Sequence, residues 1–223
     1  MSMQSWFAEA KELPSLQVDI FFQIHERFFY GPDRISDISD FERLTEELTP
    51  PGIRSAMSSL VSTSEAFGHE RELALYYQQI IRMARKHGRP ITSVHNNFWL
   101  RLRFWNGEHE THISFPWYDS LREIDSFLET LVLTDSGLVH HDIEQGWELE
   151  TYAFCGLLYF MGRDPDAGTT HCVIAVPRDD VVAQVKEVRW RANAIIEYLS
   201  KALGADVWTD HVRTEPAFKL EPL

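Results

Sequence analysis

The feature that most constrains the fold of this chain is a strand–turn–strand–helix pattern over residues 146–204, which ends in one long amphipathic helix. Pro177 stands where a helix can begin, since its missing N–H is not needed in the first turn. Gly204 stands where a left-handed residue often ends a helix. A helix packed on a sheet is favoured over a coiled-coil seam, because the heptad pattern is short and contains small residues. The apolar stripe comprises Val181, Val185, Val188, Ala192, Ile195, Leu199 and Ala202.

The same order of elements occurs earlier in the chain. Residues 97–105 alternate between two faces as a strand does, and Asn106-Gly107 is a dipeptide typical of tight hairpin turns. We expect a second strand over residues 108–115, then a helix opened by Pro116, and an extra strand near residues 138–141. The repeated order predicts two ββα units that share one antiparallel sheet and are backed by their helices. The inner face of the first helix would carry Leu121, Ile124, Phe127, Leu128 and Leu131.

The first ninety residues are predicted to be mostly helical. Apolar residues between Leu16 and Phe29 have the spacing of an amphipathic helix that ends at Gly31-Pro32. Shorter helices are expected over residues 41–48 and 53–61. The clearest helix of this half lies over residues 70–87, where one face is apolar and basic residues gather at the C-terminal end.

The sequence therefore predicts an α+β fold in a single domain, residues 1–223. Its parts are a helical subregion over residues 1–90, a sheet-containing ββα-ββα subregion over 91–204 and a tail over 205–223, in which an apolar Val207-Trp208 pair precedes a polar end. A chain of 223 residues is long enough for one large core and marginal for two.

The net charge of −13 excludes several classes of partner. Nucleic-acid binding needs a basic surface, and an anionic membrane surface would repel this chain. A basic protein partner is compatible with the charge, because complementary charge speeds association; the alternative is that the charge serves solubility alone. No apolar run approaches the ~20 residues of a membrane span, and residues 1–12 lack a signal-peptide pattern, so we expect a cytoplasmic protein.

The two cysteines are expected to be buried free thiols in the two strands of the predicted hairpin. A turn near Asp166 would place Cys172 opposite Phe160 and away from Cys155, so a disulfide would need a bulge or a different pairing.

Three groups contain residue types that bind metals, and none has the spacing of a metal motif. The groups are His109-Glu110-Thr111-His112, His140-His141-Asp142 and His171-Cys172. Consecutive residues on a strand point to opposite faces, so none of these segments can supply convergent ligands alone. The chain also lacks a nucleophile elbow and a phosphate-binding glycine loop. We therefore predict no catalytic residue, no metal and no cofactor.

An acidic cluster surrounds Gly146-Trp147. Paired carboxylates beside a tryptophan occur in glycosidases, but alternation along a strand places Glu148 and Glu150 on one face and Trp147 and Leu149 on the other. The cluster is then either a solvated sheet face or a protein-binding surface. The candidate partner-binding residues are Asp142, Glu144, Trp147, Glu148 and Glu150.

The run His140–Glu150 (HHDIEQGWELE), followed by a hairpin and the helix start at Pro177-Arg178-Asp179-Asp180, resembles segments of small acidic bacterial proteins. Many of these are encoded beside polymorphic or secretion-system toxins and are classed as immunity proteins. The resemblance covers about the last third of the chain. It implies binding and blocking of a cognate toxin, but it transfers no functional residue.

The leading hypothesis is an acidic cytoplasmic immunity protein that neutralises a basic toxin, with a nuclease as the first candidate. A second hypothesis is a hydrolase whose Glu and His side chains are brought together by the fold. A third is an assembly protein that uses aromatic residues of the N-terminal helices, and a homodimer through those helices is compatible with all three. The aromatic residues are Phe21, Phe22, Phe28, Phe29 and Tyr30.

Overall fold

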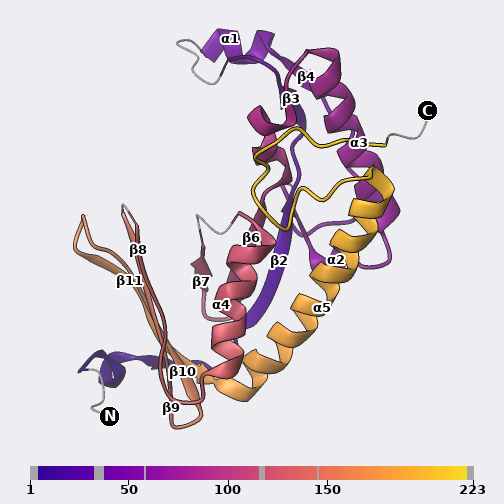
Figure 1. Ribbon diagram of the computed structural model, residues 1–223. Coiled ribbons are helices and arrows are strands. Elements are labelled where there is room, and N and C mark those ends of the chain that lie inside the picture. Colours follow the sequence, from indigo (N-terminus) through magenta and orange to yellow (C-terminus); the bar gives the residue numbers. More distant parts are fainter. Residues whose placement is uncertain (1–4, 33–37, 58, 116–118, 145, 220–223) are drawn as a thin grey trace. The chain divides into compact units, whose positions relative to one another are not determined.

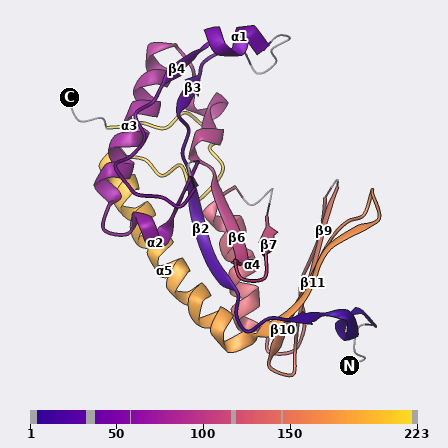
Figure 2. The same cartoon turned by 180° about the vertical axis from the view of Figure 1, so that it is seen from behind.

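The computed structural model describes residues 5–32, 38–57, 59–115, 119–144 and 146–219. It combines helices with mainly antiparallel sheets, so the prediction of an α+β fold is confirmed (Figures 1 and 2). The chain divides into two units. The first contains Met1–Asp19, Leu102–Tyr118 and Arg122–Trp190, and the second contains Ile20–Arg101, Asp119–Leu121 and Arg191–Leu223.

A five-stranded sheet organises the first unit, with strand order β1-β11-β10-β9-β8. All neighbouring strands are antiparallel except β1, which runs parallel to β11. The elements of this unit are the 3-10 helix η1 (Ser5–Glu9), β1 (Lys11–Glu12), β7 (Thr111–Ser114), α4 (Leu121–Leu133), β8 (Gly137–Glu144), β9 (Trp147–Phe154), β10 (Leu157–Asp164) and β11 (Thr169–Pro177).

A two-residue turn, Cys155-Gly156, joins β9 to β10. Both residues have positive φ angles, 49° and 78°, as a type I′ hairpin turn requires. The sequence pattern instead predicts one strand that continues toward Asp166. The region contains two strands, and Cys155 is exposed in the turn, so the prediction that both cysteines are buried strand residues was wrong for Cys155. Cys172 lies opposite Gly162, and Phe160 pairs with Ile174.

The turn between β10 and β11 was predicted correctly near Asp166. The Asp164 carboxylate accepts hydrogen bonds from the backbone N–H groups of Asp166 and Ala167, both at 2.9 Å. Gly168 then adopts a φ of 66°, a left-handed conformation that glycine adopts without steric cost.

Aromatic rings form the centre of the first unit. Phe104 lies 5.6 Å from Phe160 of the sheet and 6.0 Å from Phe127 of α4, between ring centroids, and Phe115 lies 5.0 Å from Phe127. The predicted inner face of α4 is confirmed: Leu121, Ile124, Phe127, Leu128 and Leu131 are all buried.

The second unit contains more strand than the sequence analysis predicted. Strand β2 (Gln17–Gln23) is buried on both faces from Val18 to Phe22, with Asp19 included, so burial does not alternate along it and periodicity does not distinguish it from a helix. The elements that lie wholly in the second unit are β3 (Arg27–Phe29), α1 (Ile38–Arg43), β4 (Thr45–Glu47), β5 (Leu60–Ser62), α2 (Thr63–Ala66), α3 (Glu70–Lys86), η2 (Ile91–Ser93) and η3 (His95–Phe98).

The prediction of a helical N-terminal half was therefore wrong. Phe21, Phe22 and Phe28 lie in β2 or β3 and are core residues, while Phe29 and Tyr30 are half-buried. These aromatic residues are not on helices that could form the predicted dimer contact. The helix predicted over residues 70–87 is confirmed as α3.

Four elements have residues in both units: β2 (Gln17–Gln23), β6 (Leu100–Asn106), α5 (Arg178–Leu203) and α4, whose first residue Leu121 belongs to the second unit. A four-stranded sheet has the order β5-β2-β6-β7, and β3 pairs with β4. Since β6 and β7 belong to a different sheet from β8–β11, the two predicted ββα units do not share one sheet. The alternation predicted for β6 is confirmed, with Leu100, Leu102 and Phe104 buried on one face.

The β6–β7 connection is longer than the expected two-residue turn at Asn106-Gly107. Asn106 pairs with Thr111, which leaves four residues in the loop. The Asn106 side chain is buried: its amide nitrogen donates to the Ser15 carbonyl at 2.8 Å, and its oxygen accepts from the His109 N–H at 3.1 Å. Asn106 therefore ends the strand instead of forming the turn.

Helix α5 agrees with the prediction. Six residues of the predicted stripe are buried, Ala202 is half-buried, and Gly204 follows the helix with a φ of 80°. Pro177 is the last residue of β11 and immediately precedes the helix. None of the helices in the described part of the chain is long and apolar enough to cross a membrane.

The described part of the segment after Gly204 folds back into the second unit, where the predicted apolar pair Val207-Trp208 is buried. Trp208 is only 1% exposed, and its indole ring meets the rings of Tyr77 and Phe98 edge-on at 4.9 and 5.7 Å. The Leu121 N–H donates to the Trp208 carbonyl at 2.8 Å, and the Lys219 N–H donates to the Leu203 carbonyl at 2.7 Å.

We predict that Trp208→Ala lowers the free energy of unfolding by about 3–5 kcal/mol, because it leaves a large cavity among aromatic rings. The control is Trp190→Ala, which removes the same side chain from a position that is 59% exposed. Its effect should stay below about 1 kcal/mol. Urea denaturation followed by circular dichroism measures both, and equal effects of the two variants would show that the C-terminal segment adds little to the fold.

Candidate functional site

The pairing of β8 with β9 separates the acidic cluster into two faces. Directly opposed residues of an antiparallel pair share a face. Asp142 pairs with Leu149 and Glu144 with Trp147, so these lie on one face, whereas Glu148 and Glu150 lie on the other. The predicted alternation along β9 is therefore confirmed. The five candidate residues do not form one surface.

Trp147 contributes to packing on the inner face of the sheet. Its indole ring lies 6.3 Å from the Phe115 ring in an edge-on arrangement, and the neighbouring Leu149 is fully buried. His140 shares this side, with its ring 4.9 Å from that of Phe127. Burial lowers the pKa of His140, which keeps its imidazole neutral near pH 7.

The opposite face of the sheet has an aromatic part and a charged part. Phe7 of η1 stacks on Tyr159 with ring centroids 4.1 Å apart, and it also meets Tyr152 and Phe154. Further along the same face of β9 come Glu150 and then Glu148. The short helix η1 thus covers the aromatic part and leaves the carboxylates outside its contact.

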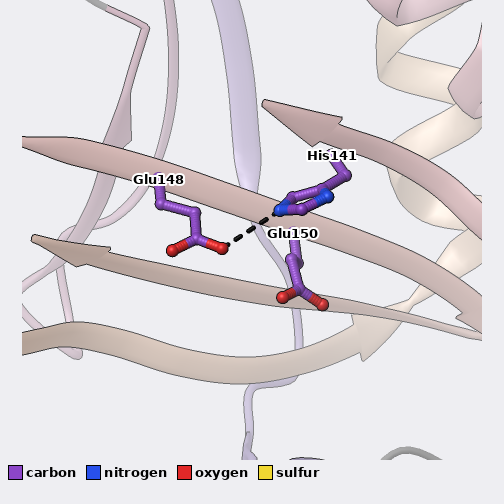
Figure 3. A group of neighbouring side chains, drawn as sticks. All are labelled: His141, Glu148 and Glu150. Carbon is purple, nitrogen blue, oxygen red and sulfur yellow. Dashed lines mark hydrogen bonds and ion pairs between the residues drawn. The ribbon is translucent and has the colours of Figure 1, made fainter. Parts of the chain in front are cut away.

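Glu148 is the centre of the charged part (Figure 3). Its side chain is only 2% exposed, so it is not part of a solvated face as one interpretation held. Arg163 of β10 holds the carboxylate with two hydrogen bonds, from Nε at 2.5 Å and from Nη2 at 2.9 Å. The His141 Nε2 lies 3.0 Å from Oε1 of the same carboxylate.

These contacts decide the charge state of Glu148. The Arg163 guanidinium holds the pKa of the Glu148 carboxyl below its usual value, and the contact with His141 acts in the same direction. Burial alone would raise the pKa, but the paired hydrogen bonds outweigh it. Glu148 is therefore an ionised carboxylate that is neutralised within the sheet.

His141, Glu148 and Glu150 have the residue types of a metal site. One ligand atom from each lies within 4.8 Å of the others, and imidazole with carboxylates suits zinc. Both oxygens of Glu148 are already bound by Arg163, however. An ion would have to displace this arginine, so the group fits a salt-bridge cluster better than a metal centre.

The pairing with Arg163 also makes Glu148 unsuited to act as a general acid or base. A general acid or base must exchange a proton at the working pH, whereas Arg163 favours the ionised form of Glu148 throughout the neutral range. Of the other metal-type residues considered, His109 and Glu110 lie in the β6–β7 turn, and His112 lies in β7.

Strand β8 is an edge strand of this sheet and exposes apolar side chains. It lies at the end of the strand order, and β9 is its only strand neighbour within the described residues. Leu138 and Ile143 are 51% and 56% exposed. A register shift between Leu138 and His140 marks an irregularity near its start. An edge strand offers unpaired backbone groups to another chain.

Neither the pairing of Arg163 with Glu148 nor the contact between His141 and Glu148 is among the contacts predicted from the sequence. Both contacts depend on the turns before and after β9, because these turns set the pairing of β9 with β8 and with β10. A two-residue turn at Cys155-Gly156 places residue 148 opposite residue 163, as observed. Cys-Gly is not a common hairpin pair, and for this reason the sequence pattern gave little indication of this register.

We predict that Glu148→Gln destabilises the protein at neutral pH by about 1–2 kcal/mol, because it removes charge-assisted hydrogen bonds from a buried position. A depressed pKa contributes stability above the unfolded-state pKa of about 4.3, and this contribution is lost as the pH falls through the folded-state pKa. The difference between the two proteins should therefore shrink toward pH 3.

Urea denaturation midpoints between pH 7 and pH 3 measure this difference. Glu150→Gln is the matched control, since it removes a carboxylate from the same strand face and leaves the Glu148–Arg163 pair in place. A Glu148→Gln effect that does not change with pH would mean that side-chain shape, and not charge, is responsible.

Comparisons with known proteins add no relative: no family model, no curated protein and no solved structure matches this chain.

Proposed function

We propose that this protein binds a basic protein partner along strand β8 and that the partner is a bacterial toxin, which it neutralises in the cytoplasm. One observation carries the proposal. The eight-residue strand β8 is a sheet edge with exposed apolar side chains, Leu138 and Ile143, and with the carboxylates Asp142 and Glu144 at one end. We call these four residues and their backbone the β8 edge.

The β8 edge suits an extended segment of another protein. Such a segment can add to a sheet as one more strand, with backbone hydrogen bonds for affinity and side-chain contacts for specificity. Leu138 and Ile143 lie on one face of the strand and would contact apolar residues of the partner. Asp142 and Glu144 lie on the other face and would attract lysine or arginine.

The net charge of the chain supports the proposal that the partner is basic. The chain carries a net charge of −13, which accelerates encounter with a cationic protein and disfavours acidic ones. Toxins that act on nucleic acids need a basic substrate groove, so a nuclease is the toxin class that best matches this charge. By covering such a groove, this protein would keep the nucleic-acid substrate from binding to the toxin.

The proposal changes the roles of three candidate residues. Glu148 is bound by Arg163 inside the sheet, Trp147 packs against Phe115, and Glu150 lies beside the salt-bridge cluster. In this proposal they support the shape of the β8–β9 hairpin. Direct contact with the partner is made by the β8 edge.

The experiment that tests the proposal is co-expression with the product of the neighbouring gene in the source genome, followed by affinity capture. We expect a stable complex and rescue of growth if that product is toxic. Absence of both a complex and rescue would contradict toxin neutralisation. Size-exclusion chromatography with light scattering of the protein alone then shows whether β8 instead pairs with a second copy.

Given such a complex, Glu144→Lys should weaken binding about tenfold or more, mainly through slower association, because it places a like charge beside a basic segment. The control is Glu129→Lys, which makes the same change in charge at an exposed position of α4. Surface plasmon resonance at two salt concentrations measures both variants. Equal weakening by the two would point to overall charge and argue against the β8 edge as the contact.

A further inference from the structure

A cavity of about 560 Å³ lies in the first unit, between β7 and the ends of β10 and β11 near their connecting turn. Its lining comes from β1, β7, β9, β10 and β11 and from the end of the β6–β7 turn, and all these lining residues belong to the same unit. A volume of this size is typical of small-molecule sites. Neither the β8 edge nor the Glu148 carboxylate lines it.

A glycine creates the floor of the cavity. Gly162 of β10 lies directly opposite Cys172 of β11, and a Cβ atom at residue 162 would lie only 3.1 Å from the Cys172 sulfur. Any larger residue at position 162 would therefore fill space and press on the thiol. Burial raises the pKa of Cys172, so the floor carries a neutral thiol.

Apolar side chains form the walls. Ile113 of β7 and Ile174 of β11 are buried, and the half-buried Trp147 contributes from β9. An indole ring and two branched aliphatic side chains suit the apolar or aromatic body of a small molecule.

Polar donors surround the mouth of the cavity. Lys11 of β1, His112 of β7 and His171 of β11 all line it and are exposed to solvent. Within the part of the chain that the structure describes, the side chains of these three residues make no hydrogen bond and no ion pair. Their donors are therefore available to a ligand.

The lining of this cavity has little net charge, although the whole chain is strongly acidic. Lys11 and Arg163 are cations and Glu110 is the acidic residue of the lining, while His112 and His171 add imidazole donors. Arg163 is already engaged by Glu148, which leaves Lys11 as the cation that can pair with a ligand. Although the chain has a net charge of −13, this cavity offers the ammonium group of Lys11 and two imidazole donors to an anion.

We propose that this cavity binds a small organic anion with a carboxylate or phosphate head and an apolar body. The head would lie at the mouth beside Lys11, His112 and His171, and the body would lie against Trp147 and Ile174 above Gly162. The proposal is independent of the toxin-binding proposal, because it uses other residues and another class of ligand.

The test is an NMR titration of the full-length, isotope-labelled protein with two anionic probes, phenyl phosphate and benzoate. Benzylamine, which has the same ring and the opposite charge, is the control ligand. We expect the amide signals of Lys11, His112 and Gly162 to shift with a Kd below about 1 mM for at least one anion. The two probes distinguish a phosphate head from a carboxylate head.

Two variants locate the site. Lys11→Met should weaken binding of the better anion by about tenfold, or about 1.4 kcal/mol, while Lys186→Met, at an exposed position of α5, should leave it unchanged. Gly162→Val should abolish binding by filling the floor. The proposal is overturned if neither anion shifts these signals at about 10 mM, if benzylamine shifts them equally, or if Lys11→Met binds like the parent protein.

Discussion

The backbone register of β9 with its two neighbours is the constraint on which the sheet of the first unit depends. Antiparallel pairing has a side-chain period of two, so a slip of one residue would move every side chain to the other face. The turn at Cys155-Gly156 fixes this register on one side by placing Leu157 opposite Phe154. The same register places Glu148 opposite Arg163, which is what allows a carboxylate to be buried there.

This register gives the two faces of the sheet different roles. One face joins the aromatic core through Phe160 and Leu149. The other face is partly covered by Phe7 and otherwise carries the paired charges of Glu148 and Arg163. A buried ion pair contributes little net stability compared with apolar packing, but losing one partner is costly. A slip of the register would separate Glu148 from Arg163 and leave the buried carboxylate without its partner. The pairing also removes Glu148 from the residues that could contact a partner.

The two proposed binding regions follow from the same topology. At one end of the strand order β8 has an open edge, with Asp142 and Glu144 near its turn. Toward the other end, β11 and the short strand β1 bring His171 and Lys11 to a cavity over Gly162. A strongly acidic chain can thus present carboxylates to a basic protein and still keep a cation and imidazoles for a small anion.

The sequence by itself determined the elements whose pattern is local. The amphipathic stripes of α3, α4 and α5, the alternation of β6 and the faces of Trp147 and Glu148 all follow from periodicity, because burial on one side repeats every 3.6 or every two residues. Only the tertiary structure decided the rest. Strand β2 is buried on both faces and has no distinguishing period, the Cys155-Gly156 turn depends on an uncommon pair of residues, and Trp208 is buried by residues distant in sequence. The Glu148–Arg163 contact belongs to this second group, since it joins residues 15 positions apart whose pairing depends on where one turn falls.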